Sequence, residues 1–258
     1  MILSGVVSVT FRHLTADEII ALAVRANLQS IEWGGDIHVP HGAIKTAEAV
    51  GSATRKAGLK VASYGSYYKV GTNDNIETSF IKVLQTASAL EAPNIRVWAG
   101  NRPSGATDES VWQSMIEETR FIADLAGEQN IRVSFEYHAN TLTDSSESAA
   151  RLLHEIGHPN VFCYWQPPIH LDEQERLISL QAITPWISNV HVFHWRETGQ
   201  FALAQGELEW MPYMDEITRL NGDRYALLEF VKNDSVDQFL EDAADLKRIV
   251  AHAAQKAK

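Results

Sequence analysis

Short apolar runs recur along the chain, separated by longer stretches with helical periodicity. The runs are rich in β-branched and aromatic residues, and most are continuously apolar. Strands that are buried on both faces have this pattern, as in parallel sheets covered by helices. Eight runs are predicted as strands: "GVVSVT" (5–10), "SIEW" (30–33), "LKVASYG" (59–65), "NIRVW" (94–98), "IRVSFEY" (131–137), "VFCYWQ" (161–166), "NVHVFHW" (189–195) and "YALLEFV" (225–231).

Capping signals show where several helices begin. Thr15 is followed three residues later by Glu18, which is a capping box, and Ser235 stands in the same relation to Gln238. A third helix is expected to begin at an Asp144 cap and to end at Gly157. The expected helices are 15–28, 43–57, 75–90, 109–129, 144–157, 172–183, 210–220 and 235–254.

Strands and helices therefore alternate strictly, which is typical of α/β proteins. The pattern predicts a single (β/α)₈ TIM barrel, although a doubly wound sheet alternates as well. Neither a low-complexity linker nor a shift in composition divides the chain. We therefore expect residues 1–258 to form one domain, and barrels often reach this length as one domain.

Composition and charge narrow the class of protein. Hydrophobic residues make up 45% of the 258 residues, which is ample for a core, and the formal net charge is −11. A nucleic-acid-binding protein normally needs a basic surface, so this class is disfavoured. Cys163 is the one cysteine, which fits a reducing compartment. No signal peptide and no run of membrane-spanning length is recognisable, so we expect a cytoplasmic protein without a membrane partner.

Polar residues at the ends of the last four predicted strands suggest a metal site. The active site of such a barrel lies at the carboxyl ends of its strands. Glu136 and Glu229 lie within apolar strands, where a carboxylate is costly to bury unless it is paired or bound to a cation. Gln166 and His191 lie on the two strands between them. This oxygen and nitrogen donor set suits Mn²⁺, which is the ion we expect, or Mg²⁺, Co²⁺ or Zn²⁺.

The order of several stretches resembles a known family. "IEWGGDIHVPHG", "FEYHANTLTD", "NVFCYWQPP", "NVHVFHW", "AQGELEW" and "LLEFV" together resemble the xylose isomerase-like TIM barrels, the sugar phosphate isomerase/epimerase group. The branches most similar are the ketose 3-epimerases, inosose dehydratases and hydroxypyruvate isomerases. The resemblance implies a Glu, Asp, His, Glu metal set, carried here by Glu136, Gln166, His191 and Glu229. Gln166 departs from the usual Asp, which puts the metal affinity in question.

The resemblance also implies an activity. It implies a metal-dependent sugar isomerase or epimerase that transfers a proton next to a carbonyl through an enediolate. Glu136 and Glu229 would each be both a metal ligand and an acid/base group. The partner would be a small sugar or sugar derivative, and a homodimer or tetramer is compatible with the relatives.

Further polar and aromatic residues near the strand ends are candidate substrate contacts. They are His138, His194, Arg196, Trp98, Trp165, Trp33 and Tyr64. The tryptophans after strands, Trp195 included, would give an aromatic wall for a sugar. Each also has a purely structural interpretation: tryptophans cap a barrel core, and histidines fill it. Glu32 is equally open to both interpretations. Glu136 and Glu229 could instead form buried ion pairs with Arg96 or Arg132.

Four alternative functions remain open at this point. A keto-inositol-type dehydratase would use the same site and expel a β-hydroxyl group. A metal-dependent endonuclease would need more His and Asp ligands and a basic face. A glycosidase would use two carboxylates without a metal. A non-catalytic or metal-free sugar-binding barrel would bind without turnover. The sequence does not identify the substrate, or whether it is phosphorylated.

Overall fold

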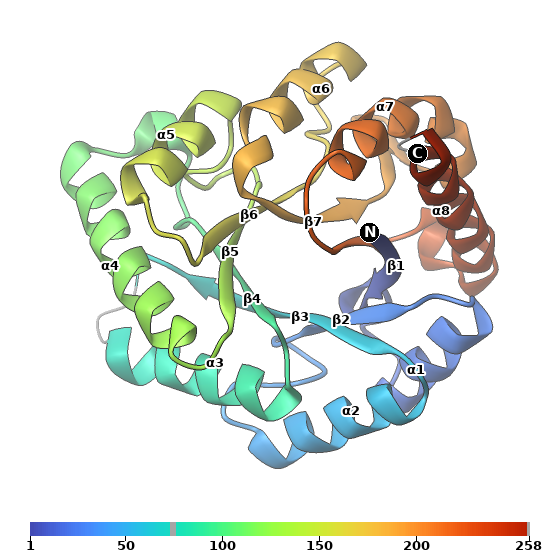
Figure 1. Cartoon of the computed structure of the whole chain (residues 1–258), viewed down its shortest axis with the longest axis horizontal. Coiled ribbons are helices and arrows are strands. Elements are labelled where there is room, and N and C mark those ends of the chain that lie inside the picture. The colour runs from blue at the N-terminus through green and yellow to red at the C-terminus, as the bar shows by residue number, and fades with distance from the viewer. Residues whose placement is uncertain (73–75, 257–258) are drawn as a thin grey trace.

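Eight parallel strands close into a barrel that is ringed by helices (Figure 1) in the computed structural model, which describes residues 1–72 and 76–256. Each strand pairs with its neighbours in the order β1-β10-β7-β6-β5-β4-β3-β2, and the pairing of β1 with β10 closes the ring. The prediction of a single (β/α)₈ barrel is therefore confirmed. The barrel strands are β1 (Ile2–Val7), β2 (Ser30–Gly34), β3 (Lys60–Lys69), β4 (Asn94–Trp98), β5 (Arg132–Glu136), β6 (Val161–Trp165), β7 (Ile187–Val192) and β10 (Arg224–Leu228).

The helices lie on the outside of the barrel, between successive strands (Figure 1). They are α1 (Ala16–Arg25), α2 (Ile44–Lys56), α3 (Ile76–Leu90), α4 (Glu109–Gly127), α5 (Ser146–Ile156), α6 (Glu173–Ala182), α7 (Glu207–Thr218) and α8 (Val236–Lys256). The capping box at Thr15 is present, and Gly157 ends α5 in the left-handed conformation. Asn75, the expected start of the third helix, lies outside the described residues, as do residues 257 and 258.

The expected Asp144 cap was wrong. Ser145 is the N-cap of α5, and its side chain accepts a hydrogen bond from the backbone N–H of Ser148. Asp144 instead accepts a hydrogen bond from the backbone N–H of Ser104, 3.0 Å away, and its carboxylate faces the loop after β4. Serine and aspartate are both good caps, so their adjacency in the sequence left the choice between them undetermined.

The main apolar core packs between the strands and the helices, whereas the inside of the barrel holds buried charged and polar residues, among them Glu32, Arg96 and His191. Successive side chains of a strand point to opposite faces. On β2, Glu32 points into the barrel, and Trp33 points outward, donating a hydrogen bond to Thr54 of α2. This alternation decides which strand-end residues can reach a ligand inside the barrel.

A small antiparallel hairpin follows β7 and was not expected. The run predicted over 189–195 divides at Phe193, where β7 has ended and β8 (His194–Arg196) begins. β8 pairs with β9 (Gly199–Phe201) outside the barrel. Among the described residues, no helix is both long and apolar enough to cross a membrane.

Candidate metal centre and active site

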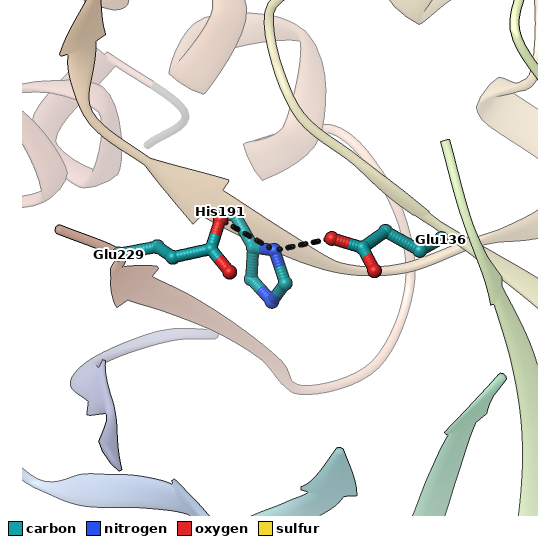
Figure 2. A group of neighbouring side chains, drawn as sticks. All are labelled: Glu136, His191 and Glu229. Atoms are coloured by element: carbon teal, nitrogen blue, oxygen red, sulfur yellow. Dashed lines mark ion pairs between the residues drawn. The ribbon is translucent and has the colours of Figure 1, made fainter. Parts of the chain in front are cut away.

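Three of the predicted ligands converge inside the mouth of the barrel. Glu136 ends β5, His191 lies in β7, and Glu229 directly follows β10. His191 Nδ1 lies 3.5 Å from Glu136 Oε1 and 3.3 Å from Glu229 Oε2. Figure 2 shows the two carboxylates approaching the imidazole from opposite sides. One donor atom from each residue lies within 4.8 Å of the other two, which is close enough for one ion to contact all three.

His191 has the environment of a cation site. It is completely buried, and neither ring nitrogen has a hydrogen-bond partner among the described residues. Burial alone would lower the pKa of His191, but Glu229 and Glu32 outweigh it and raise the pKa well above its usual value. The surrounding carboxylates therefore favour a positive charge at this position. Either a protonated imidazole or a divalent ion bound to a neutral imidazole would supply that charge. This donor set fits a divalent metal.

Arg96 holds Glu136 in place from inside the barrel. Arg96 is buried, with Nε donating to Glu32 Oε1 at 2.7 Å and Nη1 donating to Glu136 Oε2. Trp98 Nε1 also donates to Glu136 Oε2, at 2.5 Å. Burial would raise the pKa of Glu136, but Arg96 lowers it well below the usual range. Oε2 is thus occupied by two donors, and Oε1 is left to face His191.

The ion-pair interpretation weighed from the sequence therefore holds for Glu136 and Arg96, whereas Arg132 is not part of the site. The Arg132 guanidinium lies over the Phe162 ring at 5.1 Å, at the opposite end of β5 from Glu136. Glu32, left open by the sequence, is completely buried and belongs to the same network. Burial would raise the pKa of Glu32, but Arg96 and His191 lower it to about 2.

Gln166 follows β6 and lines the same cavity as Glu136 and Glu229. Its Nε2 donates to the backbone carbonyl of Tyr137 at 3.0 Å. This bond leaves Oε1 free to contact a ligand. An aspartate at this position would have no N–H with which to make the bond to the Tyr137 carbonyl. The role of Gln166 as fourth metal ligand stays a prediction.

We expect Gln166→Glu to bind Mn²⁺ more tightly than the wild type, by about tenfold, because a charged oxygen ligand binds a hard cation more strongly. Glutamate also loses the hydrogen bond to the Tyr137 carbonyl, which opposes this gain. Gln166→Met is the matched control, because methionine has neither the N–H donor nor the oxygen ligand. Calorimetric titration with Mn²⁺ measures the three affinities. Equal affinities for all three proteins would show that residue 166 does not contact the ion.

A cavity of about 420 Å³ opens above these residues at the mouth. Trp98 and His138 form one wall, with their rings stacked at 4.8 Å. Trp195 forms another wall and packs against Phe193 and Phe230. His138 Nδ1 lies 2.7 Å from the Ala139 carbonyl, so Nδ1 donates to it and Nε2 is the nitrogen left for a ligand. The cavity thus combines apolar walls with acid/base groups at its base.

Three predicted substrate contacts lie outside the mouth, and those expectations were wrong in location. Trp33 donates to Thr54 of α2, and Trp165 donates to Ser179 of α6 at 3.0 Å and packs against Trp210. The Tyr64 hydroxyl donates to the Val39 carbonyl at 2.7 Å. Each follows an inward-facing residue on its strand, so the alternation of side chains turns it toward the helices. The other two predicted tryptophans, Trp98 and Trp195, do line the mouth cavity.

His194 and Arg196 belong to the hairpin and also lie away from the mouth cavity. The His194 ring packs against Gly206, where a β-carbon would lie 2.3 Å from its Nδ1. Arg196 pairs with Glu209 of α7 and lines a neighbouring hollow of about 630 Å³, which shares Ile169 and His170 with the mouth cavity. The continuous apolar run hid the break at Phe193, which carries both side chains out of the barrel.

Burial and the nearby Arg196 and Arg176 lower the pKa of His194 to about 4. The unfolded chain, with a histidine pKa of about 6.5, takes up this proton first, so the free energy of unfolding falls as the pH drops from about 6.5 to 4. We expect His194→Gln to reduce that loss, measured by urea unfolding between pH 7.5 and 5. The exposed His252 gives the control His252→Gln. Identical pH slopes for wild type and His194→Gln would contradict the assignment.

The cavity also contains residues that were not predicted as site residues. Asp144 lines it, with Oδ1 buried and without a hydrogen-bond partner among the described residues. Tyr67 lies over the Arg96 guanidinium at 4.9 Å in a left-handed backbone conformation (φ 56°). Phe230 shares that conformation (φ 54°) beside Glu229. A polar or aromatic residue near the end of a strand or after it was the available signal, but the local backbone conformation decides which of these side chains turn inward.

The fold and this site together define a class: (β/α)₈ barrels with a metal-type donor set at the mouth. A model of the family "Xylose isomerase-like TIM barrel" matches residues 20–250, so the chain belongs to this family. The family resemblance read from the sequence is therefore confirmed.

One relative and two solved structures show what the chain is similar to. The chain is 24% identical over 260 residues to a 3-dehydroshikimate dehydratase of Bacillus anthracis, covering 89% of this chain and 91% of the relative. The crystal structure of a probable 3-dehydroshikimate dehydratase from that organism, involved in petrobactin synthesis, is similar with a TM-score of 0.80, 21% identity, and coverage of 96% and 99%. A D-psicose 3-epimerase crystallised in the presence of D-fructose gives a TM-score of 0.76, 14% identity, and coverage of 97% and 99%.

Proposed function

We propose that this protein is a divalent-metal-dependent enzyme that transfers a proton next to the carbonyl of a small hydroxylated substrate, as a sugar isomerase or epimerase does. The observation that carries the proposal is the convergence of Glu136, His191 and Glu229 beneath the mouth cavity, where neither imidazole nitrogen has a hydrogen-bond partner among the described residues. Membership of the family supports the same class of function. Mn²⁺ is the ion we expect, held by these three residues and Gln166.

Glu229 is the proposed base. Glu136 has one oxygen occupied by Arg96 and Trp98, so it suits a fixed ligand better than a group that must gain and lose a proton. Glu229 lines the cavity and makes its ion pair with His191. The bound ion would supply positive charge for the oxygen that becomes negative when the proton leaves. This revises the expectation that both glutamates carry protons.

His138 is the proposed second acid/base group. Its Nε2 has no hydrogen-bond partner among the described residues, and its ring is stacked on Trp98 in the wall of the cavity. In an epimerase it would return a proton to the face opposite Glu229. In an isomerase it would move the proton between the two oxygens. The apolar walls exclude water from the reacting atoms, which strengthens the electrostatic interactions there.

Dehydration is the second candidate, and the named relative supports it. The relative with 24% identity along most of both chains is a 3-dehydroshikimate dehydratase. The same two groups would serve: Glu229 removes the proton next to the carbonyl, and His138 protonates the β-hydroxyl group as it leaves as water. A glycosidase is disfavoured because His191 lies between the two carboxylates, where the scissile bond would have to enter.

The test is incubation of the protein in D₂O with Mn²⁺ and a panel of compounds. The panel holds keto-sugars, their phosphates, keto-inositols and 3-dehydroshikimate, and NMR follows both deuterium incorporation and products. Deuterium in an unchanged or isomerised compound supports the isomerase or epimerase. An unsaturated product supports the dehydratase. Full turnover in the presence of a strong chelator would contradict the proposal that the enzyme depends on a metal.

A further inference from the structure

A buried arginine lies behind the wall of the mouth cavity. Arg176, in the first turn of α6, is 2% exposed. Its Nε donates to the Pro168 carbonyl at 2.9 Å, and its Nη2 donates to the Ile169 carbonyl at 3.2 Å and to the Trp195 carbonyl at 3.4 Å. One planar guanidinium therefore joins the loop after β6 to the hairpin after β7.

Both joined segments line the mouth. Gln166, Pro167, Pro168 and Ile169 line the cavity on one side, and Trp195 lines it further along. Arg176 is absent from the described residues that line this cavity, so it lies behind the walls and outside the space for the substrate. Any effect of Arg176 on a ligand must pass through these two segments.

The loop after β6 has few ways to hold its own shape. Pro167 and Pro168 have no backbone N–H, so this stretch cannot form the usual turn through its own donors. Within the loop, the N–H of Leu171 donates to the Pro168 carbonyl at 3.3 Å. The Arg176 fork adds charged donors to two successive carbonyls, and hydrogen bonds from charged groups are the stronger ones.

Glu209 of α7 completes the arrangement. Its carboxylate is mostly buried, with an 11% exposed side chain, and it lies 3.4 Å from Arg176 Nη1 while also accepting a hydrogen bond from Arg196. It thus balances the buried charge of Arg176 and ties the hairpin to α7. Arg176 thus contacts three parts of the fold: the loop after β6, the hairpin after β7, and Glu209 of α7.

We propose that Arg176 is a positioning residue, which fixes the loop carrying Gln166 against the hairpin carrying Trp195 and so sets how tightly the mouth holds its substrate. Its kinetic consequence rests on the proposed function, whereas its mechanical consequence does not. Three of the four proposed metal ligands, Glu136, His191 and Glu229, lie on or directly after strands β5, β7 and β10, so they should keep their positions without it.

The first experiment needs no substrate. Hydrogen–deuterium exchange, read by mass spectrometry, compares wild type with Arg176→Met and Arg176→Lys. We expect exchange to become about tenfold faster in two sets of peptides, those covering residues 166–172 and those covering residues 193–197. Exchange in the barrel strands should stay unchanged. Arg176→Lys keeps the charge but has no fork, so it should resemble Arg176→Met. If Arg176→Met is too unstable to purify, the comparison of Arg176→Lys with wild type is sufficient.

Arg224 provides the matched control. Its guanidinium also binds three backbone carbonyls, those of Ile187, Asn221 and Gly222, at 3.1, 2.7 and 3.3 Å. It begins β10, at the end of the barrel opposite the mouth. Arg224→Met should leave exchange in the two mouth segments unchanged. Unaltered exchange in either segment of the Arg176 variants, or equal acceleration in Arg224→Met, would overturn the proposal.

The second experiment uses whichever compound of the panel the wild type converts. We expect Arg176→Lys to raise KM about tenfold while kcat changes less than about threefold. An unchanged KM, or a loss confined to kcat, would overturn the positioning role even if exchange responds. If wild type converts none of the compounds, the proposed function fails on its own, and the exchange experiment still decides the role of Arg176.

Discussion

Replacing Glu229 with glutamine is expected to lower proton exchange at the substrate carbon by about 10³-fold or more. Glutamine keeps the size of the side chain but cannot accept the proton. It also removes one of the two carboxylates that face Nδ1 of His191, so Mn²⁺ should bind less tightly as well. Steady-state rates of deuterium incorporation, with Mn²⁺ affinity from calorimetry, measure both losses.

Saturation with Mn²⁺ separates the two roles of Glu229. A residue that served as a ligand alone would regain activity once excess ion fills the site. A base would not, because the missing proton acceptor is still missing. We expect the rate to stay low at saturating Mn²⁺. Glu197→Gln, an equivalent change at an exposed glutamate in the turn of the β8–β9 hairpin, should retain full activity. Recovery of Glu229→Gln with Mn²⁺ would assign the proton transfer to another group.

The strand–helix order was predictable because burial on both faces leaves a clear mark on a sequence. Continuous apolar runs between capped helices predicted the barrel, and the order of the strands then predicted that Glu136, His191 and Glu229 would meet. It was harder to predict to which face of the strand each side chain at a strand end points. Trp33 and Trp165 each adjoin an inward-facing residue, and a shift of one position moves a side chain from the cavity to the helix layer.

Loop geometry and pairing were not predictable from the same signals. Asp144 reaches the cavity from the loop after β5, and Tyr67 from the irregular part of β3, where the pairing with β4 shifts register. Both conformations depend on distant partners, the Ser104 N–H and the Arg96 guanidinium. Arg96 and Arg132 were equivalent candidates as ion-pair partners. They lie on neighbouring strands: Arg96, in the middle of β4, reaches into the barrel, whereas Arg132, the first residue of β5, lies over the Phe162 ring. Only the closed barrel distinguishes them.

The largest effect on stability is expected from Arg96→Met. This change leaves Glu32 and Glu136 buried without the cation that both contact, and removing one partner of a buried ion pair typically lowers the free energy of unfolding by about 3–5 kcal/mol. Urea unfolding without metal measures the loss. Arg132→Met, at an exposed arginine on the neighbouring strand, is the control and should change stability by less than about 1 kcal/mol.

A double-mutant cycle tests whether the loss comes from unpaired charge. Glu32→Gln alone should destabilise the protein, because it removes the Glu32 partner of Arg96. Added to Arg96→Met, the same change should restore part of the lost stability, because one buried carboxylate disappears. The Arg96→Met deficit should also shrink as the pH is lowered toward 5, because protonation neutralises a carboxylate that has lost its cation. Strictly additive losses with no dependence on pH would mean that Arg96 acts through packing, and that the buried charges around His191 are balanced without it.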